Sequence, residues 1–336
     1  MKYQNINIIG TGIYHPTNIV KNEPFVEHFK KQNIDIVGLL KKTGKKNRYI
    51  IENKEENSLT MAIHSSQNAL ENAKVLPEEL DIIVFVSDMP EYLSPSNALI
   101  IQNKIEAINA HRVYDINSNC LGMITALDQL NAMMKVNKNL KKALIVGSIV
   151  SSDIARSDCP VIYPMGGDAS VAIVLESKEE EIKRGVISSK YLTLSKYYNK
   201  ALSPACGMTK AKTDEVSSYD RRIKWIPFNM EFCPEIWVKM IKEFSKECNF
   251  EIEEIEQYFI SQLTINYLKN TAKLLGIKKY KEKFPYIADE FGYTGATSPF
   301  LAMHRFLENK DIQSGAKSII ASVGTGLTLG SIYYIF

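Results

Sequence analysis

The sequence predicts an α/β fold built from two similar halves. Two observations predict it: short apolar segments alternate with longer amphipathic ones, and this order recurs along the chain. Short segments rich in β-branched residues are typical of buried strands, whereas apolar residues at three- and four-residue steps are typical of helices. Their alternation favours a mostly parallel sheet that is covered by helices.

Several segments have the length and composition of buried strands. They are Ile6–Gly10, Asp81–Ser87, Ala143–Gly147, Ala169–Leu175, Tyr258–Ser261, Ser318–Val323 and Gly330–Ile335. Helical spacing is clearest in Ser58–Lys74 and Leu121–Lys135. In the second stretch Ile124, Leu127 and Leu130 fall on one face, so we expect this helix to pack against the sheet.

The order of segments recurs at an offset of roughly 175 residues, which indicates a duplication. PEELDIIVFVSD corresponds to IEEIEQYFIS, YDINSNCLGMITALDQL to IADEFGYTGATSPFLAMHRFL, and KKALIVGS to AKSIIASVG. We therefore predict two halves, residues 1–176 and 177–336. Their boundary would lie in the charged run SKEEEIKRG.

The composition is that of an ordinary globular protein, with 45% hydrophobic and 24% charged residues. A net charge of +3 is too small for a dedicated nucleic-acid or membrane protein, and the first residues lack the apolar stretch of a signal peptide. The cysteines form no CxxC pair, which argues against a disulfide framework and a metal site. We expect a cytoplasmic protein without a metal. The cysteines are Cys120, Cys159, Cys206, Cys233 and Cys248.

Cys120 is the candidate nucleophile. It follows the strand-like VYDIN and precedes the apolar helix, so its thiol is expected at a helix N-terminus. The free N–H groups and the dipole there favour the thiolate and lower the cysteine pKa. Gly122 would allow close approach of neighbouring backbone. The alternative is a buried structural cysteine.

Motifs along nearly the whole chain resemble those of the thiolase superfamily, most closely its β-ketoacyl-acyl-carrier-protein synthase III branch. In order, they are IIGTGIYHP, TGKKNRYI, DINSNCLG, MGGDASVAIVL, TAKLLG, FGYTGATS and GTGLTLGS. The resemblance implies the thiolase-like duplicated αβαβα five-layer fold. It also implies a homodimer.

The resemblance further implies a two-step reaction in which an acyl thioester acylates Cys120 and a second substrate then takes the acyl group. The thioester would be carried on the phosphopantetheine of acyl-carrier protein or on CoA, and no separate cofactor is expected. Backbone N–H groups of Cys120 and Thr325 would form the oxyanion hole, with Gly324 and Gly326 allowing a tight loop. A plain structural turn is the alternative interpretation of this loop.

The chain departs from the condensing members at two positions. Their catalytic histidine corresponds to Ser261 and their asparagine to Tyr293. Serine cannot replace an imidazole as an acid or base at neutral pH, so ordinary decarboxylative condensation is expected to be absent or severely slowed. No other histidine is an obvious substitute. Tyr293 would either donate a hydrogen bond to an intermediate or plug the pocket.

Asp88 directly follows the strand IIVFVS. In the related hydroxymethylglutaryl-CoA synthases a glutamate at the equivalent place is the general acid–base group, and a buried Asp88 would deprotonate an alcohol or amine acceptor. The alternative is a cap on the turn DMPEYLSP.

The donor site is altered as well. The tryptophan and arginine that hold the CoA adenine correspond to Gly38 and Lys42, while GLLKKTGKKNR keeps five cations. Lys42 and Lys46 are therefore candidate ligands for a pantetheine phosphate or an acidic carrier protein, unless this is a solvated basic face. Ser94 corresponds to the bulky residue that limits acyl length, which suggests room for a longer chain.

These observations are compatible with two functions. The first is an acyltransferase of fatty-acid, polyketide-type or secondary-metabolite biosynthesis that acts through Cys120. The second is a non-condensing partner subunit that forms a heterodimer with a complete synthase, because two catalytic side chains are missing. An authentic housekeeping synthase III is disfavoured by the same losses.

Overall fold

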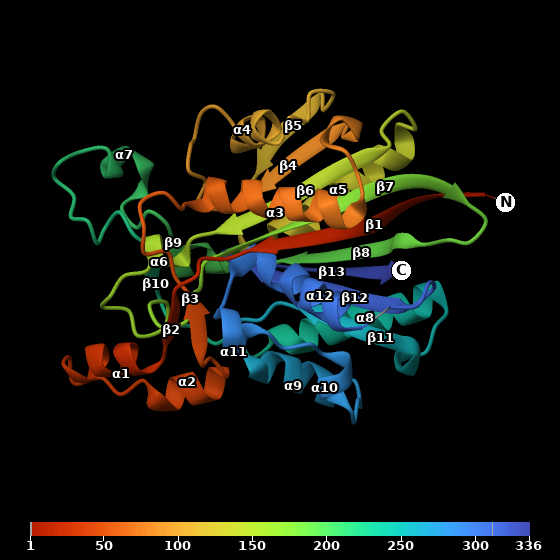
Figure 1. Ribbon diagram of the computed structural model, residues 1–336. Coiled ribbons are helices and arrows are strands. Elements are labelled where there is room, and N and C mark those ends of the chain that lie inside the picture. Colours follow the sequence, from red (N-terminus) through yellow and green to blue (C-terminus); the bar gives the residue numbers. More distant parts are fainter. Residues whose placement is uncertain (1, 311) are drawn as a thin grey trace.

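The computed structural model describes residues 2–310 and 312–336, which form two main β-sheets with helices on and between them (Figure 1). One sheet has the order β1-β7-β6-β4-β5 and the other has the order β11-β12-β13-β8. The first contains β1 (Tyr3–Tyr14), β4 (Ile82–Val86), β5 (Arg112–Ile116), β6 (Lys142–Ile149) and β7 (Ala169–Glu180). The second contains β8 (Gly185–Thr193), β11 (Ile255–Ile260), β12 (Lys317–Gly324) and β13 (Thr328–Ile335).

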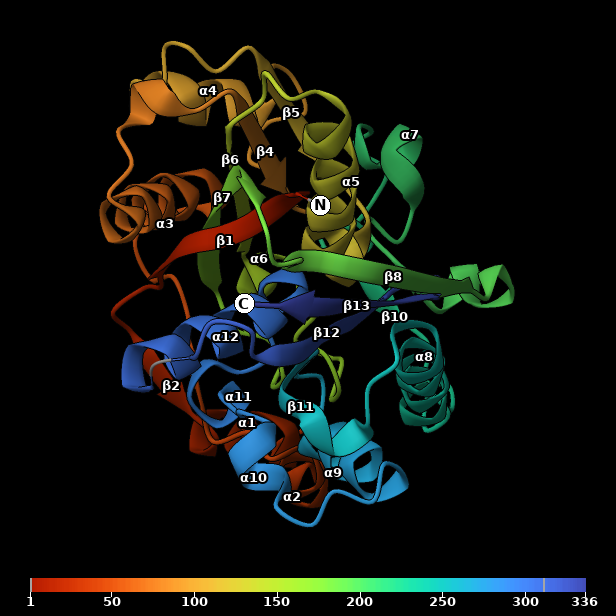
Figure 2. The same cartoon turned by 90° about the vertical axis from the view of Figure 1, so that its right-hand side faces the viewer.

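The helices and the two sheets make five layers, as the resemblance implied (Figure 2). Helices α5 (Gly122–Val136) and α12 (Ser298–Asn309) lie between the sheets. Helices α3 (Ser58–Ala73) and α4 (Asn97–Lys104) cover one outer face, and α8 (Cys233–Cys248) and α9 (Ile265–Leu274) cover the other. The central strands β4, β6 and β12 are therefore buried on both faces, which explains why they read as continuous apolar runs.

Successive side chains of β4 pack on opposite faces of the sheet. Ile82 and Val84 pack into the central core with α5, whereas Ile83 and Phe85 pack outward against α3 and α4. This follows from the two-residue period of a strand. The central core also contains residues of the second sheet, so the two halves share one hydrophobic layer.

The prediction of a mostly parallel sheet is wrong, because both sheets are mixed. Pairs β4–β5, β4–β6 and β11–β12 are parallel, but β1–β7, β6–β7, β12–β13 and β13–β8 are antiparallel. The turn of residues 325–327 alone joins β12 to β13, and so short a connection can only join antiparallel strands. The sequence pattern also missed β8.

The duplication is visible in the geometry. Strands β1, β7, β6 and β4 take the same order in their sheet as β8, β13, β12 and β11 in theirs. The predicted boundary after residue 176 needs correction, however, because it falls inside β7. The charged residues at the end of β7 still pair with β1, from Tyr3 opposite Glu180 onward, so the strand continues through them.

The remaining elements are short. The segment before α3 contains β2 (Ile19–Lys21), α1 (Glu23–Lys30), α2 (Val37–Thr43) and β3 (Asn47–Tyr49), and in Figure 1 it lies beside the C-terminal half. The others are α6 (Ser151–Ile154), β9 (Ala201–Leu202), α7 (Gly207–Ala211), β10 (Lys224–Trp225), α10 (Tyr280–Lys283) and α11 (Ala288–Phe291). No helix in the described ranges combines the length and apolar character needed to cross a bilayer.

Candidate active site

Cys120 lies where β5 leads into α5, as the sequence predicted. It belongs to the 3₁₀ turn η2 (Asn119–Leu121), directly before the first residue of α5. Asn119 has a positive φ of 49°, and its amide is bound by the side chain of Asn117 at 3.0 Å. A Cβ on Gly122 would lie 2.4 Å from Cγ1 of Val86, so glycine lets the helix begin against β4. Gly122 was expected to allow close approach of neighbouring backbone, but the group that approaches it is the side chain of Val86.

The C-terminal half closes over this turn. The 3₁₀ turn η5 (Gly295–Thr297) precedes α12 just as η2 precedes α5. A Cβ on Gly295 would lie 3.7 Å from the Cys120 sulfur and 2.5 Å from Cδ1 of Ile149. The Ser322 hydroxyl of β12 donates to the Cys120 carbonyl at 2.6 Å. The nucleophile is therefore held between the corresponding helix starts of the two halves.

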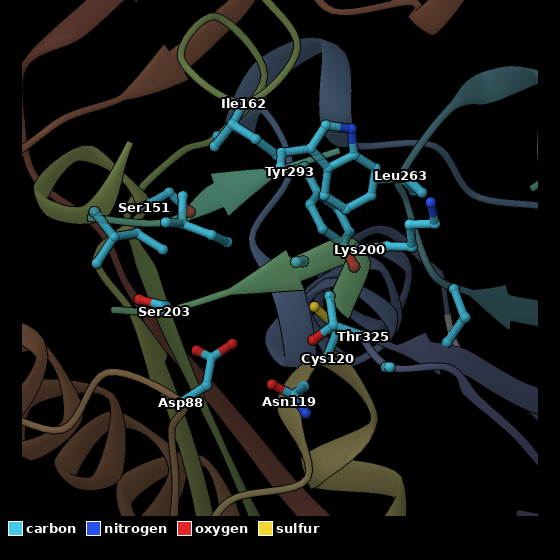
Figure 3. Close-up of a pocket in the computed structure, with 18 of the residues that line it drawn as sticks. Asp88, Asn119, Cys120, Ser151, Ile162, Lys200, Ser203, Leu263, Tyr293 and Thr325 are labelled. Atoms are coloured by element: carbon cyan, nitrogen blue, oxygen red, sulfur yellow. The ribbon is translucent and has the colours of Figure 1, made fainter. Parts of the chain in front are cut away.

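A cavity of about 310 Å³ opens at the Cys120 sulfur (Figure 3). It brings together four of the predicted site residues: Asp88, Cys120, Tyr293 and Thr325. Much of the rest of the wall is apolar. It includes Ile149, Ile154, Ile162, Trp225, Phe228 and Met230.

Tyr293 and Ser261 occupy the positions of the missing asparagine and histidine, but only Tyr293 lines the cavity. Its hydroxyl hydrogen-bonds to the Cys120 sulfur and lies 3.4 Å from the Ser261 hydroxyl. Ser261 is fully buried behind it. The candidate catalytic residue Ser261 therefore does not reach the cavity, and its hydroxyl contacts the site by way of Tyr293. Burial raises the pKa of Tyr293 well above its usual range, so its hydroxyl stays a donor.

The prediction of a lowered Cys120 pKa is wrong. Burial raises the pKa of the Cys120 thiol to about 12, and the negative charge of Asp88 adds to the increase. The hydrogen bond from Tyr293 and the backbone amide of Cys120 oppose it. Desolvation of the sulfur outweighs the helix start because the apolar walls disfavour the charged form. At neutral pH the Cys120 side chain is therefore a protonated thiol.

Asp88 faces the same cavity (Figure 3). Burial raises the pKa of its carboxyl group. The turn that follows is held by other side chains: the Ser87 hydroxyl accepts from the Met89 amide at 3.0 Å, and Asn97 accepts from the Tyr92 amide at 3.1 Å. This arrangement favours the acid–base interpretation of Asp88 over the cap.

The loop after β12 lies against the nucleophile. A Cβ on Gly324 would be 3.0 Å from the Ser118 carbonyl oxygen, and Gly326 has a φ of 112°. Thr325 lines the cavity, and its amide donates to no acceptor in the described part of the chain. The position suits an oxyanion donor, and that role of Thr325 and Cys120 stays a prediction.

The basic segment divides into exposed and buried cations. Lys42 and Lys46 are exposed, and they pair with Glu231 at 3.4 Å and with Asp289 at 3.5 Å. Neither lines the cavity, although Glu231 is adjacent to the wall residue Met230. Their role in substrate binding stays a prediction for the molecular surface.

Lys45 and Arg48 are buried, which corrects the expectation that all five cations are available to a phosphate. The Lys45 ammonium donates to the Gln262 carbonyl at 2.6 Å and lies 5.8 Å from the centre of the Tyr293 ring. The Arg48 guanidinium donates to the Pro164 carbonyl at 2.6 Å. Both side chains therefore link distant segments inside the protein through hydrogen bonds to backbone carbonyls.

Ser94 is exposed and does not line the cavity of the single chain. Its relation to acyl length stays a prediction. None of the histidines lines the cavity either, and the described residues contain no acidic, cysteine and histidine cluster that could hold a metal.

Sequence reasoning missed two lysines near the site. Lys45 reads as one more surface cation in a basic run, yet it is enclosed beneath Tyr293. Lys200 lines the cavity, although it lies 80 positions beyond Cys120 in a segment that matched no motif. No local signal marks either residue, because Lys45 stands in a run of polar residues and Lys200 lies outside the motifs.

A duplicated five-layer fold with a cavity-lining cysteine at a central helix start defines a thiolase-fold protein of the cysteine-dependent acyl-transfer class. Two family models match the chain: 3-oxoacyl-[acyl-carrier-protein] synthase III over residues 114–194 and its C-terminal part over residues 246–335. The β-ketoacyl-[acyl-carrier-protein] synthase III of Clostridium acetobutylicum is 30% identical, with 98% of each chain covered. The chain belongs to the 3-oxoacyl-[acyl-carrier-protein] synthase III family.

Solved structures agree on the fold. The 3-oxoacyl-[acyl-carrier-protein] synthase III of Aquifex aeolicus superposes with a TM-score of 0.85 at 24% identity, covering 99% of this chain and 100% of that one. The priming β-ketosynthase of the R1128 polyketide pathway gives a TM-score of 0.85 at 17% identity, covering 99% and 96%.

Proposed function

We propose that this protein is an acyltransferase that carries an acyl group on Cys120 and is impaired in decarboxylative condensation. The observation that carries the proposal is one cavity where Cys120, Asp88 and Tyr293 meet, while the positions of the family's histidine and asparagine hold Ser261 and Tyr293. The donor would be a thioester of acyl-carrier protein or CoA, in keeping with the names of the relatives. A homodimer in the cytoplasm belongs to the same proposal.

In the first half-reaction the Cys120 sulfur attacks the thioester carbonyl carbon. The proton of its thiol passes to the Asp88 carboxylate, and Tyr293 releases its hydrogen bond as the sulfur loses negative charge. The carbon–sulfur bond of the donor then breaks, and the leaving thiolate takes the proton from Asp88. The acyl group is left as a thioester on Cys120.

In the second half-reaction an alcohol or amine acceptor gives its proton to Asp88 and attacks the Cys120 thioester. The bond between the carbonyl carbon and the sulfur breaks, and the thiolate recovers the proton from Asp88. A carboxyl group whose pKa is raised by burial suits both transfers, because its basicity lies closer to that of the groups it serves.

Condensation with a malonyl thioester needs donors that stabilise the enolate left when carbon dioxide departs. Loss of one preorganised donor costs about 10² to 10³ in rate. Tyr293 offers one hydroxyl here, and Ser261 does not reach the cavity. We therefore expect acylation to persist while condensation is slow.

Intact-protein mass spectrometry after incubation with acyl-CoA and acyl-carrier-protein thioesters tests the proposal. We expect an adduct that disappears in Cys120→Ala and forms slowly in Asp88→Asn. With malonyl-acyl-carrier protein added, β-ketoacyl product should form at a small fraction of the acylation rate. Rapid product formation would refute impaired condensation.

The missing side chains also favour a second function, a non-condensing subunit that pairs with a complete synthase. That function predicts no adduct on Cys120 with any donor, together with co-purification of a second synthase-like chain. A Cys120 adduct on the isolated protein would support the transferase and contradict the partner-subunit function.

A further inference from the structure

Lys200 is the one basic residue that lines the catalytic cavity in the described part of the chain. It ends the 3₁₀ helix η3 (Ser195–Lys200), and in the view of Figure 3 its side chain lies between Thr325 and Leu263. The cavity wall around it is largely apolar, with Trp225 and Phe228. A cation in such a wall is a specific feature rather than a solvated surface charge.

The backbone fixes Lys200 relative to the nucleophile. Its carbonyl accepts from the Ile226 amide at 2.8 Å. At the other end of the same helix, Leu194 and Leu327 exchange two backbone hydrogen bonds, of 2.7 and 3.3 Å. Leu327 follows the loop that contains Thr325, so the lysine and the proposed oxyanion loop are parts of one connected structure.

No carboxylate lies within 4.0 Å of the Lys200 ammonium in the described residues, although these contain fifteen pairs of a carboxylate with a lysine, arginine or histidine. Asp88 shares the cavity but does not pair with it. Lys200 is partly buried. An anionic group on a bound substrate would give its ammonium a charge-assisted hydrogen bond.

Two anions could reach this wall: a carboxylate on the acyl group or the phosphate of the pantetheine arm. The phosphate is separated from the reacting sulfur by the whole length of that arm, and the cavity measures only about 310 Å³. The acyl group, in contrast, stays bonded to Cys120 between the two half-reactions. Because the acyl group stays in the cavity that Lys200 lines, it is the bearer of the charge that the experiment below tests first.

We propose that Lys200 binds a carboxylate at the far end of the acyl group, so that the preferred donors are thioesters of dicarboxylic acids. This inference rests on the proposed acylation of Cys120. The substrate class is an acyl chain with a terminal negative charge. The other walls of the cavity accept its methylene groups.

The test compares acylation by the glutaryl and pentanoyl thioesters of N-acetylcysteamine, which have five-carbon acyl chains and no phosphate. Adduct formation is followed by intact-protein mass spectrometry in the wild type, Lys200→Met and Lys200→Arg. Lys196→Met is the matched control, because Lys196 lies on the same short helix, is exposed and does not line the cavity.

We expect the wild type to react about tenfold faster with the glutaryl than with the pentanoyl donor, as one hydrogen bond to a charged group allows. Lys200→Met should lose that preference while keeping the pentanoyl rate, which also shows that the variant is folded. Lys200→Arg and Lys196→Met should keep it. Equal rates in the wild type, or a preference that survives in Lys200→Met, would overturn the inference.

A second pair of donors, glutaryl-CoA and pentanoyl-CoA, separates the phosphate from the carboxylate. If Lys200→Met slows both CoA thioesters equally and neither N-acetylcysteamine thioester, the lysine binds the phosphate and the inference is wrong. A pentanoyl adduct without any glutaryl preference refutes this inference alone. The absence of an adduct from every donor refutes the proposed function and this inference with it.

Discussion

At the scale of single residues, the chemistry of Cys120 depends on burial more than on its helix. The sulfur lies at a helix start, but apolar walls and the Asp88 charge raise its pKa to about 12. The protein therefore keeps a protonated thiol at rest. The charge of Asp88 raises the pKa of this thiol, whereas the hydrogen bond from Tyr293 lowers it. The two residues therefore have opposite effects on the sulfur.

Alkylation of Cys120 by iodoacetamide measures these effects, because the thiolate is the reactive form. For a pKa of about 12 the wild-type rate should rise about tenfold per pH unit from pH 6 to pH 10 without a plateau. Asp88→Asn removes a negative charge and should raise the rate about three- to tenfold. Tyr293→Phe should lower it by a similar factor. Digestion and mass spectrometry assign the label to Cys120, and a plateau near pH 8 would contradict this account.

Lys45 offers a second electrostatic test. Burial lowers the pKa of its ammonium well below the value of an unfolded lysine. Between the folded and the unfolded pKa the unfolded chain binds one more proton, so the free energy of unfolding rises with pH by up to about 1.4 kcal/mol per pH unit. Lys45→Met should remove this contribution.

The measurement for Lys45 is urea unfolding of the wild type and the variant at several pH values from 7 to 9.5. The advantage of the methionine variant should be largest at the low end and shrink as pH rises, because removing the proton that the unfolded lysine binds costs less free energy near the unfolded pKa. An exposed lysine, as in Lys42→Met, provides the control. A constant difference between Lys45→Met and the wild type would refute the assignment.

At the scale of elements, glycines decide how closely the central helices approach the sheets. Gly122 lies at the start of α5, where a Cβ would overlap the Val86 side chain at 2.4 Å. Gly38 lies in α2 and has nothing within 4 Å of such a Cβ. The two positions are both helical and differ in their packing.

Gly122→Ala should therefore lower the free energy of unfolding by about 1–3 kcal/mol through overpacking. Gly38→Ala should raise it by about 0.5–1 kcal/mol, since alanine loses less backbone entropy in a helix. Urea unfolding of both variants checks this pair. Equal effects of the two substitutions would show that α5 can shift away from β4 without cost.

At the scale of the whole molecule, the two halves share their central layer. Phe300 and Leu301 of α12 belong to the same buried cluster as Leu127 and Leu130 of α5. The segment before α3 adds further links, such as the hydrogen bond from Lys45 to Gln262. The halves are repeats of one architecture without being independent domains.

A chain of residues 1–182 should consequently fail to fold alone, because one side of its sheet and α5 would lose their apolar partners. Circular dichroism with urea is expected to show no cooperative transition. Co-expression with residues 183–336 should restore a folded complex. A cooperative transition of the isolated half would instead show that each repeat carries its own complete core.

The sequence by itself determined the class of fold, the repeat, most strand positions and the place of Cys120 at a helix start, because local periodicity and a residue's place between a strand and a helix are properties of neighbouring positions. Only the tertiary structure decided the sheet directions, the burial of Lys45, the exposure of Ser94, the seclusion of Ser261 behind Tyr293 and the place of Lys200 in the cavity that Cys120 lines. It also reversed the expected pKa of Cys120. These features depend on which distant segments enclose a group, and desolvation by such segments outweighs the local effect of a helix start.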